Sequence, residues 1–201
     1  MSVNEYPKKA SEIIRERGID GKVIAVKIDG KLCDLDTTVE ENANIEPVEV
    51  DSPEGIEMLR HSTSHLMAQA VYRLYPGTKY GVGPAIENGF YYDMDVPAPI
   101  TEDDLPKIEE EMKRITAEAI PFERLIVSKD EAIGIFKERG DTYKLELIDG
   151  IEDNTLSLYK VGEFIDLCRG PHVPNTSYLK HFKLLSVAGA YWRGEIGRAH
   201  V

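Results

Sequence analysis

The chain has 201 residues, of which 42% are hydrophobic and 30% are charged, and its formal net charge is −12. This is the composition of an ordinary globular protein with enough apolar side chains for a packed core. No apolar run approaches the ~20 residues of a membrane-spanning helix, so we expect no membrane partner. The acidic balance argues against DNA and against non-specific RNA binding, but it still allows recognition of an RNA end that another domain holds.

The first residues carry neither the basic head nor the apolar stretch of a signal peptide, so we expect a cytoplasmic location. The two cysteines, Cys33 and Cys168, lie far apart in the sequence. In such a chain two reduced thiols are favoured over a single disulfide.

The first 50 residues predict a small α+β unit. In chain order we expect a helix over residues 8–17, strands over 22–28 and 31–35 joined by a turn at Asp29-Gly30, and a strand over 45–50. Residues 1–50 contain no cluster of catalytic side chains, so we expect this unit to serve docking or structure.

A long helix is predicted after a boundary near residue 51. Ser52 suits the N-cap, Pro53 suits the first helical position, and Tyr75-Pro76-Gly77 marks the end. Apolar and small residues recur between these signals at helical spacing and predict one buried face: Ile56, Leu59, Thr63, Leu66, Met67, Ala70 and Leu74.

Two histidines lie off that predicted face. His61 and His65 point roughly 140–180° around the helix from Ile56. Because they are four residues apart, both imidazoles face the same way. On this pair alone two interpretations stay open, solvated surface histidines and a functional site.

The middle of the chain predicts further helices and strands. Gly81 and Gly83 allow turns or close backbone approach, but they lack the context of a phosphate-binding loop. The other expected elements are a turn at Asn88-Gly89 leading into a strand, a helix capped by Thr101, a helix from a capping box of Ser128 and Glu131 to Gly140, and strands over 143–148, 156–161, 163–167 and 182–187.

A second cluster of reactive residues lies where the third of these strands runs into a Gly-Pro turn. Cys168 and His172 repeat the spacing of His61 and His65, here in a loop. Three imidazoles and one thiol suit a tetrahedral zinc site, or a metal-free site in which imidazoles orient a water. A Cys-His pair also suits a nucleophile and its base. These alternatives stay open at this point.

Long motifs in the chain resemble those of bacterial threonyl-tRNA synthetases: HSTSHLMAQAVYRLYPG, GVGPAIENGFYYD, TEDDLPKIEEEMKRI, DLCRGPHVPNT and FKLLSVAGAYWRG. The resemblance runs from about Lys8 to Gly194 and is dense from Arg60 onward. It implies an α+β chain with a ubiquitin-like β-grasp (TGS) domain in residues 1–50. An editing domain of antiparallel sheet and helices, shared with alanyl-tRNA synthetases, would occupy residues 51–194.

The resemblance also implies a reaction, hydrolysis of seryl-tRNA made in error, with the aminoacylated 3′ end of tRNA as partner. The family's site residues match His61, His65, Cys168 and His172, with Lys144 and Asp166 near the amino acid and the attacking water, Tyr92 in the pocket lining and Gly83 near the adenosine. A plain cross-strand ion pair is the alternative for Lys144 and Asp166.

The two branches of the family that share this editing domain differ in their metal requirement. The alanyl branch resembles a true zinc site built from this ligand set, whereas the threonyl branch is described as working without a metal. We therefore expect either no required cofactor or Zn²⁺ on His61, His65, Cys168 and His172. ATP and Mg²⁺ belong to the synthetic core, which this sequence lacks. The alternatives to an editing hydrolase are a non-catalytic tRNA-binding module and a structural zinc module.

The chain also departs from the family pattern. The first strand of the TGS domain and the aminoacylation core are both lacking, so we expect a monomeric piece of a homodimeric ligase. Residues 195–201 look foreign and resemble translated adaptor sequence, so we leave them out of the fold prediction.

Overall fold

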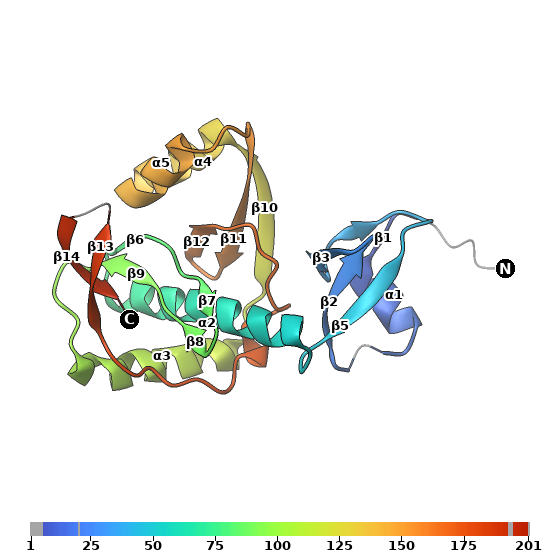
Figure 1. Ribbon diagram of the computed structural model, residues 1–201, viewed down its shortest axis with the longest axis horizontal. Coiled ribbons are helices and arrows are strands. Elements are labelled where there is room, and N and C mark those ends of the chain that lie inside the picture. The colour runs from blue at the N-terminus through green and yellow to red at the C-terminus, as the bar shows by residue number, and fades with distance from the viewer. Residues whose placement is uncertain (1–5, 20, 193–194, 201) are drawn as a thin grey trace.

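The computed structural model describes residues 6–19, 21–192 and 195–200, with side chains as far as Gly189. Helices and antiparallel sheets occur together, which confirms the α+β class. Figure 1 shows a small unit at the N-terminal end beside a larger one, and the long helix α2 runs from their junction through the middle of the larger unit. Among the described residues, no helix is both long and apolar enough to cross a bilayer.

Among the described residues, the small unit contains a three-stranded sheet, a two-stranded sheet of β1 and β4, and one helix. Its elements are β1 (Lys8–Lys9), α1 (Ala10–Glu16), β2 (Val23–Ile28), β3 (Lys31–Asp34), β4 (Thr38–Val39) and β5 (Ile45–Glu49). Among the described residues, β3, β2 and β5 are antiparallel in that order, and Ile13 and Ile14 of α1 pack with Val26 in a separate core. The predicted hairpin turn is confirmed, since Asp29 and Gly30 both have positive φ, 51° and 80°.

Helix α2 spans Pro53–Leu74, and its predicted caps are confirmed. The Ser52 hydroxyl accepts the Gly55 N–H at 3.1 Å, and the helix ends at Tyr75. The prediction of one buried stripe is wrong, because Ser62 to Val71 are buried all round the helix, whereas Ile56 is 39% exposed. The reason is tertiary: α2 is the central helix and is covered by other elements on several sides, so its polar residues are buried as well.

The larger unit is built around α2. Its elements are β6 (Lys79–Tyr80), β7 (Ala85–Ile86), β8 (Gly89–Phe90), β9 (Asp93–Asp95), η1 (Glu102–Asp104), α3 (Leu105–Glu118), β10 (Phe122–Ser128), α4 (Lys129–Arg139), α5 (Thr142–Asp149), β11 (Thr155–Val161), β12 (Phe164–Leu167), η2 (Thr176–Tyr178), β13 (Ala188–Trp192) and β14 (Glu195–His200). Among the described residues, β10-β11-β12 and β13-β14-β9-β6 are antiparallel sheets in these orders. The predicted capping boxes at Thr101 and Ser128 are confirmed.

Two predicted strands are wrong. Residues 143–148 form helix α5, in which buried Lys144 and Ile148 are four residues apart and share one face. Ile148 packs with Phe136 of α4 and Leu158 of β11. Residues 182–187 lie outside any strand or helix. There the Leu184 N–H donates to the Glu109 carboxylate of α3 at 2.8 Å instead of to a neighbouring strand. The next strand begins at Ala188.

The C-terminal residues are part of a sheet. Strand β14 pairs with β13 and with β9, so the backbone of residues 195–200 belongs to the fold that we predicted without it. The foreign origin of residues 195–201 stays a prediction, as do the domain boundaries and the missing first strand.

Candidate functional site

The structure brings together the four residues that the two spaced pairs singled out. Helix α2 supplies His61 and His65, and the loop after β12 supplies Cys168 and His172. Their potential ligand atoms all lie within 4.8 Å of one another. The Cys168 thiol lies at the centre of this cluster, with its Sγ 3.1 Å from Nε2 of His61 and 3.4 Å from Nε2 of His172.

The cluster is largely closed to solvent. His65 is 2% and His172 1% exposed, which rules out solvated surface histidines, while His61 and Cys168 are partly exposed. The His172 ring is stacked between His61 and Phe122, at centroid distances of 4.5 and 4.8 Å. His61 and Cys168 are therefore the members of the cluster that solvent can reach.

Ser62, which no pattern in the sequence singles out, fixes the orientation of His172. Its hydroxyl lies 3.0 Å from Nδ1 of His172 and accepts the Val173 N–H at 3.1 Å, in a fully buried position. This hydrogen bond leaves Nε2 of His172 directed at Cys168. A bond of this kind to the second ring nitrogen sets the tautomer and angle of a functional imidazole.

A buried ion pair lies behind the histidines. The Lys144 ammonium is 2.5 Å from Oδ1 of Asp166 and donates to the Gly81 carbonyl at 2.5 Å. The Tyr92 hydroxyl donates to Asp166, and Nε2 of His65 is 3.5 Å from the same carboxylate. The alternative of a plain cross-strand pair is wrong, because Lys144 lies on helix α5 and both charges are almost completely buried.

Gly83 and Tyr92 lie next to each other at this site. A Cβ on Gly83 would be 2.2 Å from the Tyr92 ring, so this glycine makes room for the tyrosine. The close approach of an adenosine to Gly83, which the family resemblance implies, stays a prediction. Tyr92 is fully buried, so in this structure it supports Asp166 from behind and has no exposed surface for a substrate. Its burial and the Asp166 charge raise the pKa of the Tyr92 phenol well above its usual value.

Burial also controls ionisation within the cluster. It lowers the pKa of His61 and, further, that of His65, so both imidazoles favour the neutral form with a free nitrogen lone pair. Burial and the nearby Asp166 charge raise the pKa of the Cys168 thiol to about 12. A thiol of that pKa stays protonated at neutral pH, which argues against an activated cysteine nucleophile in the metal-free site.

The donor set also fits a zinc ion. Three imidazoles and one thiol are common zinc ligands, and the separations of 3.1 and 3.4 Å at Cys168 are close to those between ligands about 2.0–2.3 Å from a tetrahedral ion. Among the described residues, Nδ1 of His65 is buried without a hydrogen-bond partner. Ser62 supplies the outer hydrogen bond that a ligating histidine usually makes.

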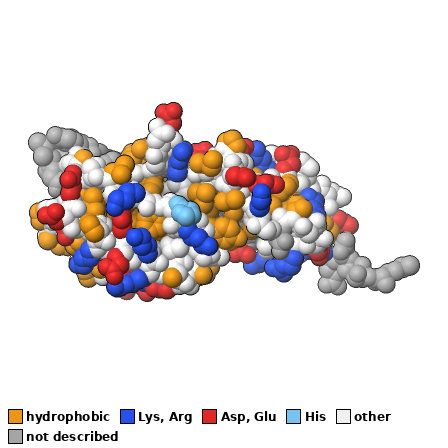
Figure 2. Space-filling view, turned by 90° about the horizontal axis from the view of Figure 1, so that it is seen from below, with side chains coloured by type: hydrophobic (Ala, Val, Ile, Leu, Met, Phe, Trp, Pro, Cys, Tyr) orange, Lys and Arg blue, Asp and Glu red, His pale blue; other side chains and the backbone are white. Residues whose placement is uncertain are grey.

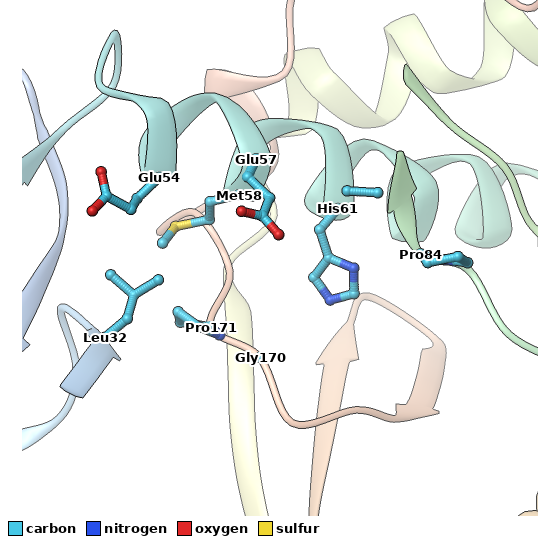
Figure 3. Close-up of a pocket in the computed structure, with 9 residues that line it drawn as sticks. Leu32, Glu54, Glu57, Met58, His61, Pro84, Gly170 and Pro171 are labelled. Carbon is cyan, nitrogen blue, oxygen red and sulfur yellow. The ribbon is translucent and has the colours of Figure 1, made fainter. Parts of the chain in front are cut away.

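A pocket of about 360 Å³ lies in front of the cluster. Figure 3 shows the His61 ring hanging from α2 into this pocket, with Pro84 on one side and Pro171 on the other. The remaining lining residues come from α2, β7, the loop before His172 and β3 of the small unit: Leu32, Glu54, Glu57, Met58, Ala85 and Gly170. The pocket therefore lies at the junction of the two units.

The surface in Figure 2 has no continuous basic stripe on the face shown. Lys and Arg side chains lie on several sides of a histidine near the middle of this face, interspersed with acidic and apolar side chains. This distribution agrees with the net charge of −12, which argues against non-specific nucleic-acid binding.

The family model and the relatives that match this chain point to the same family. Residues 156–195 match the family model described as "Threonyl and Alanyl tRNA synthetase second additional domain". The chain is 55% identical over 175 residues to a threonine–tRNA ligase of Oleidesulfovibrio alaskensis, covering 87% of the chain and 27% of that protein. It is 52% identical over 199 residues to the threonine–tRNA ligase of Bacillus velezensis, covering 96% and 31%. The chain belongs to the threonine–tRNA ligase family.

A further relative agrees with this assignment. The threonine–tRNA ligase of Thermotoga neapolitana is 54% identical over 198 residues, covering 96% of the chain and 30% of that protein. The chain thus spans about three tenths of the length of the threonine–tRNA ligases it matches. Within that length, the family model covers β11, β12 and the loop with Cys168 and His172, so the matched region includes half of the cluster.

Proposed function

We propose that this chain, which matches part of the threonine–tRNA ligases, is an editing hydrolase that cleaves the ester of seryl-tRNA. The observation that carries the proposal is the closed cluster of three imidazoles and one thiol that meets a pocket through His61. The matches to threonine–tRNA ligases and to the additional-domain family support a function connected with a tRNA synthetase, which is the setting that this proposal requires.

Such an activity has a physical rationale. Serine is smaller than threonine by one methyl group, and a pocket rejects a smaller analogue by only ~1–3 kcal/mol. A ligase for threonine therefore needs a second site that hydrolyses the seryl ester and spares the threonyl ester. That site must orient a water, stabilise the oxyanion and exclude the extra methyl group.

The described residues suit these tasks. Water attacks the ester carbonyl and loses a proton, the bond to the ribose oxygen breaks, and the ribose oxygen takes up that proton. His61 lies on the pocket wall and orients the water through a ring nitrogen. The Sγ atom of Cys168 lies 3.1 Å from Nε2 of His61. His65 and His172, with Lys144 and Asp166 behind them, hold this geometry in place.

Zinc is a candidate cofactor in this proposal. His61, His65, Cys168 and His172 would hold the ion. Because four protein ligands fill a tetrahedral zinc, one of them would have to give up its position before the ion could lower the pKa of a coordinated water and polarise the ester carbonyl. Ser62 would keep its hydrogen bond to Nδ1 of His172 in either state and so fix the angle of that ring.

The partner in this proposal is the aminoacylated 3′ end of tRNA. We also propose that the whole ligase threonylates tRNA with ATP and Mg²⁺ bound outside these residues, that it works as a homodimer in the cytoplasm, and that this piece alone is a monomer. These properties follow from the family relationship and have no site of their own among the described residues.

One second function is favoured by a specific observation. Most of the cluster is buried, as in a structural zinc site, where the metal holds the fold and takes no part in chemistry. A non-catalytic tRNA-binding module is the other alternative, although the basic residues on the face in Figure 2 form no continuous stripe.

Hydrolysis of seryl-tRNA by the purified chain, with and without a chelator, separates these functions. The proposal expects hydrolysis by the parent chain and its loss in His61→Ala with the fold retained. Loss of activity with chelator at an unchanged fold indicates a catalytic zinc, whereas unfolding by chelator indicates a structural one. A folded, metal-replete chain that binds tRNA and leaves the ester intact would contradict the proposal.

A further inference from the structure

The small unit reaches into the candidate site through one carboxylate. Asp34 is the last residue of β3, on the side of the small unit that faces the larger one (Figure 1). Its Oδ2 accepts the Tyr159 hydroxyl at 2.5 Å, and its Oδ1 accepts the His172 backbone N–H at 2.9 Å. Both carboxylate oxygens are therefore bonded to the larger unit, more than a hundred residues further along the chain.

The two donor residues are buried, whereas Asp34 itself is partly exposed. Tyr159 and His172 are each 1% exposed, and burial raises the pKa of Asp34 whereas its two hydrogen bonds lower it. Without the carboxylate, a phenol O–H and a backbone N–H would be left buried with no acceptor. Buried donors without partners are costly, so the loop would be expected to move until both are satisfied.

The loop that Asp34 holds is the one that carries Cys168 and His172. A Cβ on Gly170 would be 2.0 Å from the Tyr159 hydroxyl, so the loop lies directly on that tyrosine. The Gly170 N–H donates to Sγ of Cys168 at 3.3 Å, and the Tyr159 ring meets the His172 ring edge to face at 4.5 Å. The positions of the thiol and of this imidazole thus depend on a tyrosine whose hydroxyl Asp34 holds.

We propose that Asp34 is a positioning residue of the editing site: a carboxylate of the small unit that fixes the Cys168–His172 loop of the larger one. The inference rests on the proposed function for its catalytic consequence. It gives the N-terminal unit a task beyond docking, because the site has its working geometry only when both units are present and in contact. Leu32 of the same strand lines the pocket in front of His61, which is a second contribution of this unit.

The test compares two near-isosteric variants in the full chain. Asp34→Leu removes both acceptors, whereas Asp34→Asn keeps an oxygen that can accept the His172 N–H. Asp36→Asn is the matched control, because Asp36 lies two residues away, is exposed and pairs with Lys9. The measurements are seryl-tRNA hydrolysis per folded molecule and the exchange rate of the His172 amide by NMR.

The inference expects Asp34→Leu to lower kcat about tenfold or more with KM within about twofold, and to speed His172 exchange by a similar factor. Asp34→Asn should restore kcat to within about threefold of the parent, and Asp36→Asn should change neither quantity. A merely structural contact would not show this rescue by the conservative variant. If Asp34→Leu does not fold, Tyr159→Phe removes one of the two bonds from the other side and should lower kcat a few-fold.

The two proposals can fail separately. If the parent chain hydrolyses nothing, the proposed function fails, and faster His172 exchange in Asp34→Leu still supports the hold on the loop. If that variant exchanges the His172 amide at the parent rate, or if Asp34→Asn loses as much activity as Asp34→Leu, the inference about Asp34 is overturned.

Discussion

The buried pair of Lys144 and Asp166 gives the sharpest stability prediction. Lys144→Met keeps the length of the side chain and removes its charge, which leaves Asp166 in a site where it is 2% exposed. Removing one partner of a buried ion pair costs about 3–5 kcal/mol. Because the Tyr92 hydroxyl still donates to Asp166, we expect a value near the lower end, about 3 kcal/mol.

Urea and thermal unfolding followed by circular dichroism measure this loss. For a chain of this size, about 3 kcal/mol corresponds to a melting temperature lower by roughly 6–12 °C. The control is Lys9→Met, which breaks an exposed pair with Asp36 and should change stability little. A double variant, Lys144→Met with Asp166→Leu, should be more stable than Lys144→Met alone. A Lys144→Met chain whose stability is within about 1 kcal/mol of the parent would show that the ion pair does not offset the cost of burying Asp166.

Three further predictions follow from other contacts. Gly83→Ala places a methyl group against the Tyr92 ring and should destabilise the chain by about 1–3 kcal/mol in urea unfolding; an unchanged midpoint would show that the ring moves freely. Ser62→Ala removes the hydrogen bond to His172 and should weaken zinc binding by about 10–100-fold in a chelator competition, whereas unchanged affinity would argue against this ligand set. Hydrogen bonds from Ser128 lower the pKa of Glu131. The stability that Glu131 contributes is therefore present above its unfolded-state pKa and is lost as the pH falls through its folded-state pKa. Glu131→Gln should flatten the acid limb of a curve of stability against pH, and an acid limb identical to that of the parent would contradict this assignment.

Local signals made much of the fold predictable. The caps of α2 and α4, the turn at Asp29-Gly30 and the end of α4 at Gly140 each depend on residues within a few positions of one another, and the structure confirms all of them. The pairing of His61-His65 with Cys168-His172 could be predicted because each pair carries recognisable chemistry, and together they form a familiar ligand set.

The wrong predictions concern residues whose structure is set by packing against distant parts of the chain. Residues 143–148 alternate like a strand, but their helix buries Lys144 against Asp166, a partner that no local pattern shows. The apolar stripe on α2 was misleading because other elements cover that helix on several sides. Ser62 and Asp34 escaped prediction because their partners lie more than a hundred residues away, and a serine or aspartate carries no signal of such a contact on its own.

The decisive measurement for an editing site is the relative rate at which the parent chain hydrolyses seryl- and threonyl-tRNA. We expect the seryl ester to be cleaved at least about tenfold faster, because the extra methyl group of threonine excludes its ester from the site. Equal rates for the two esters would contradict an editing site, since a site without that discrimination would destroy the correct product as readily as the error.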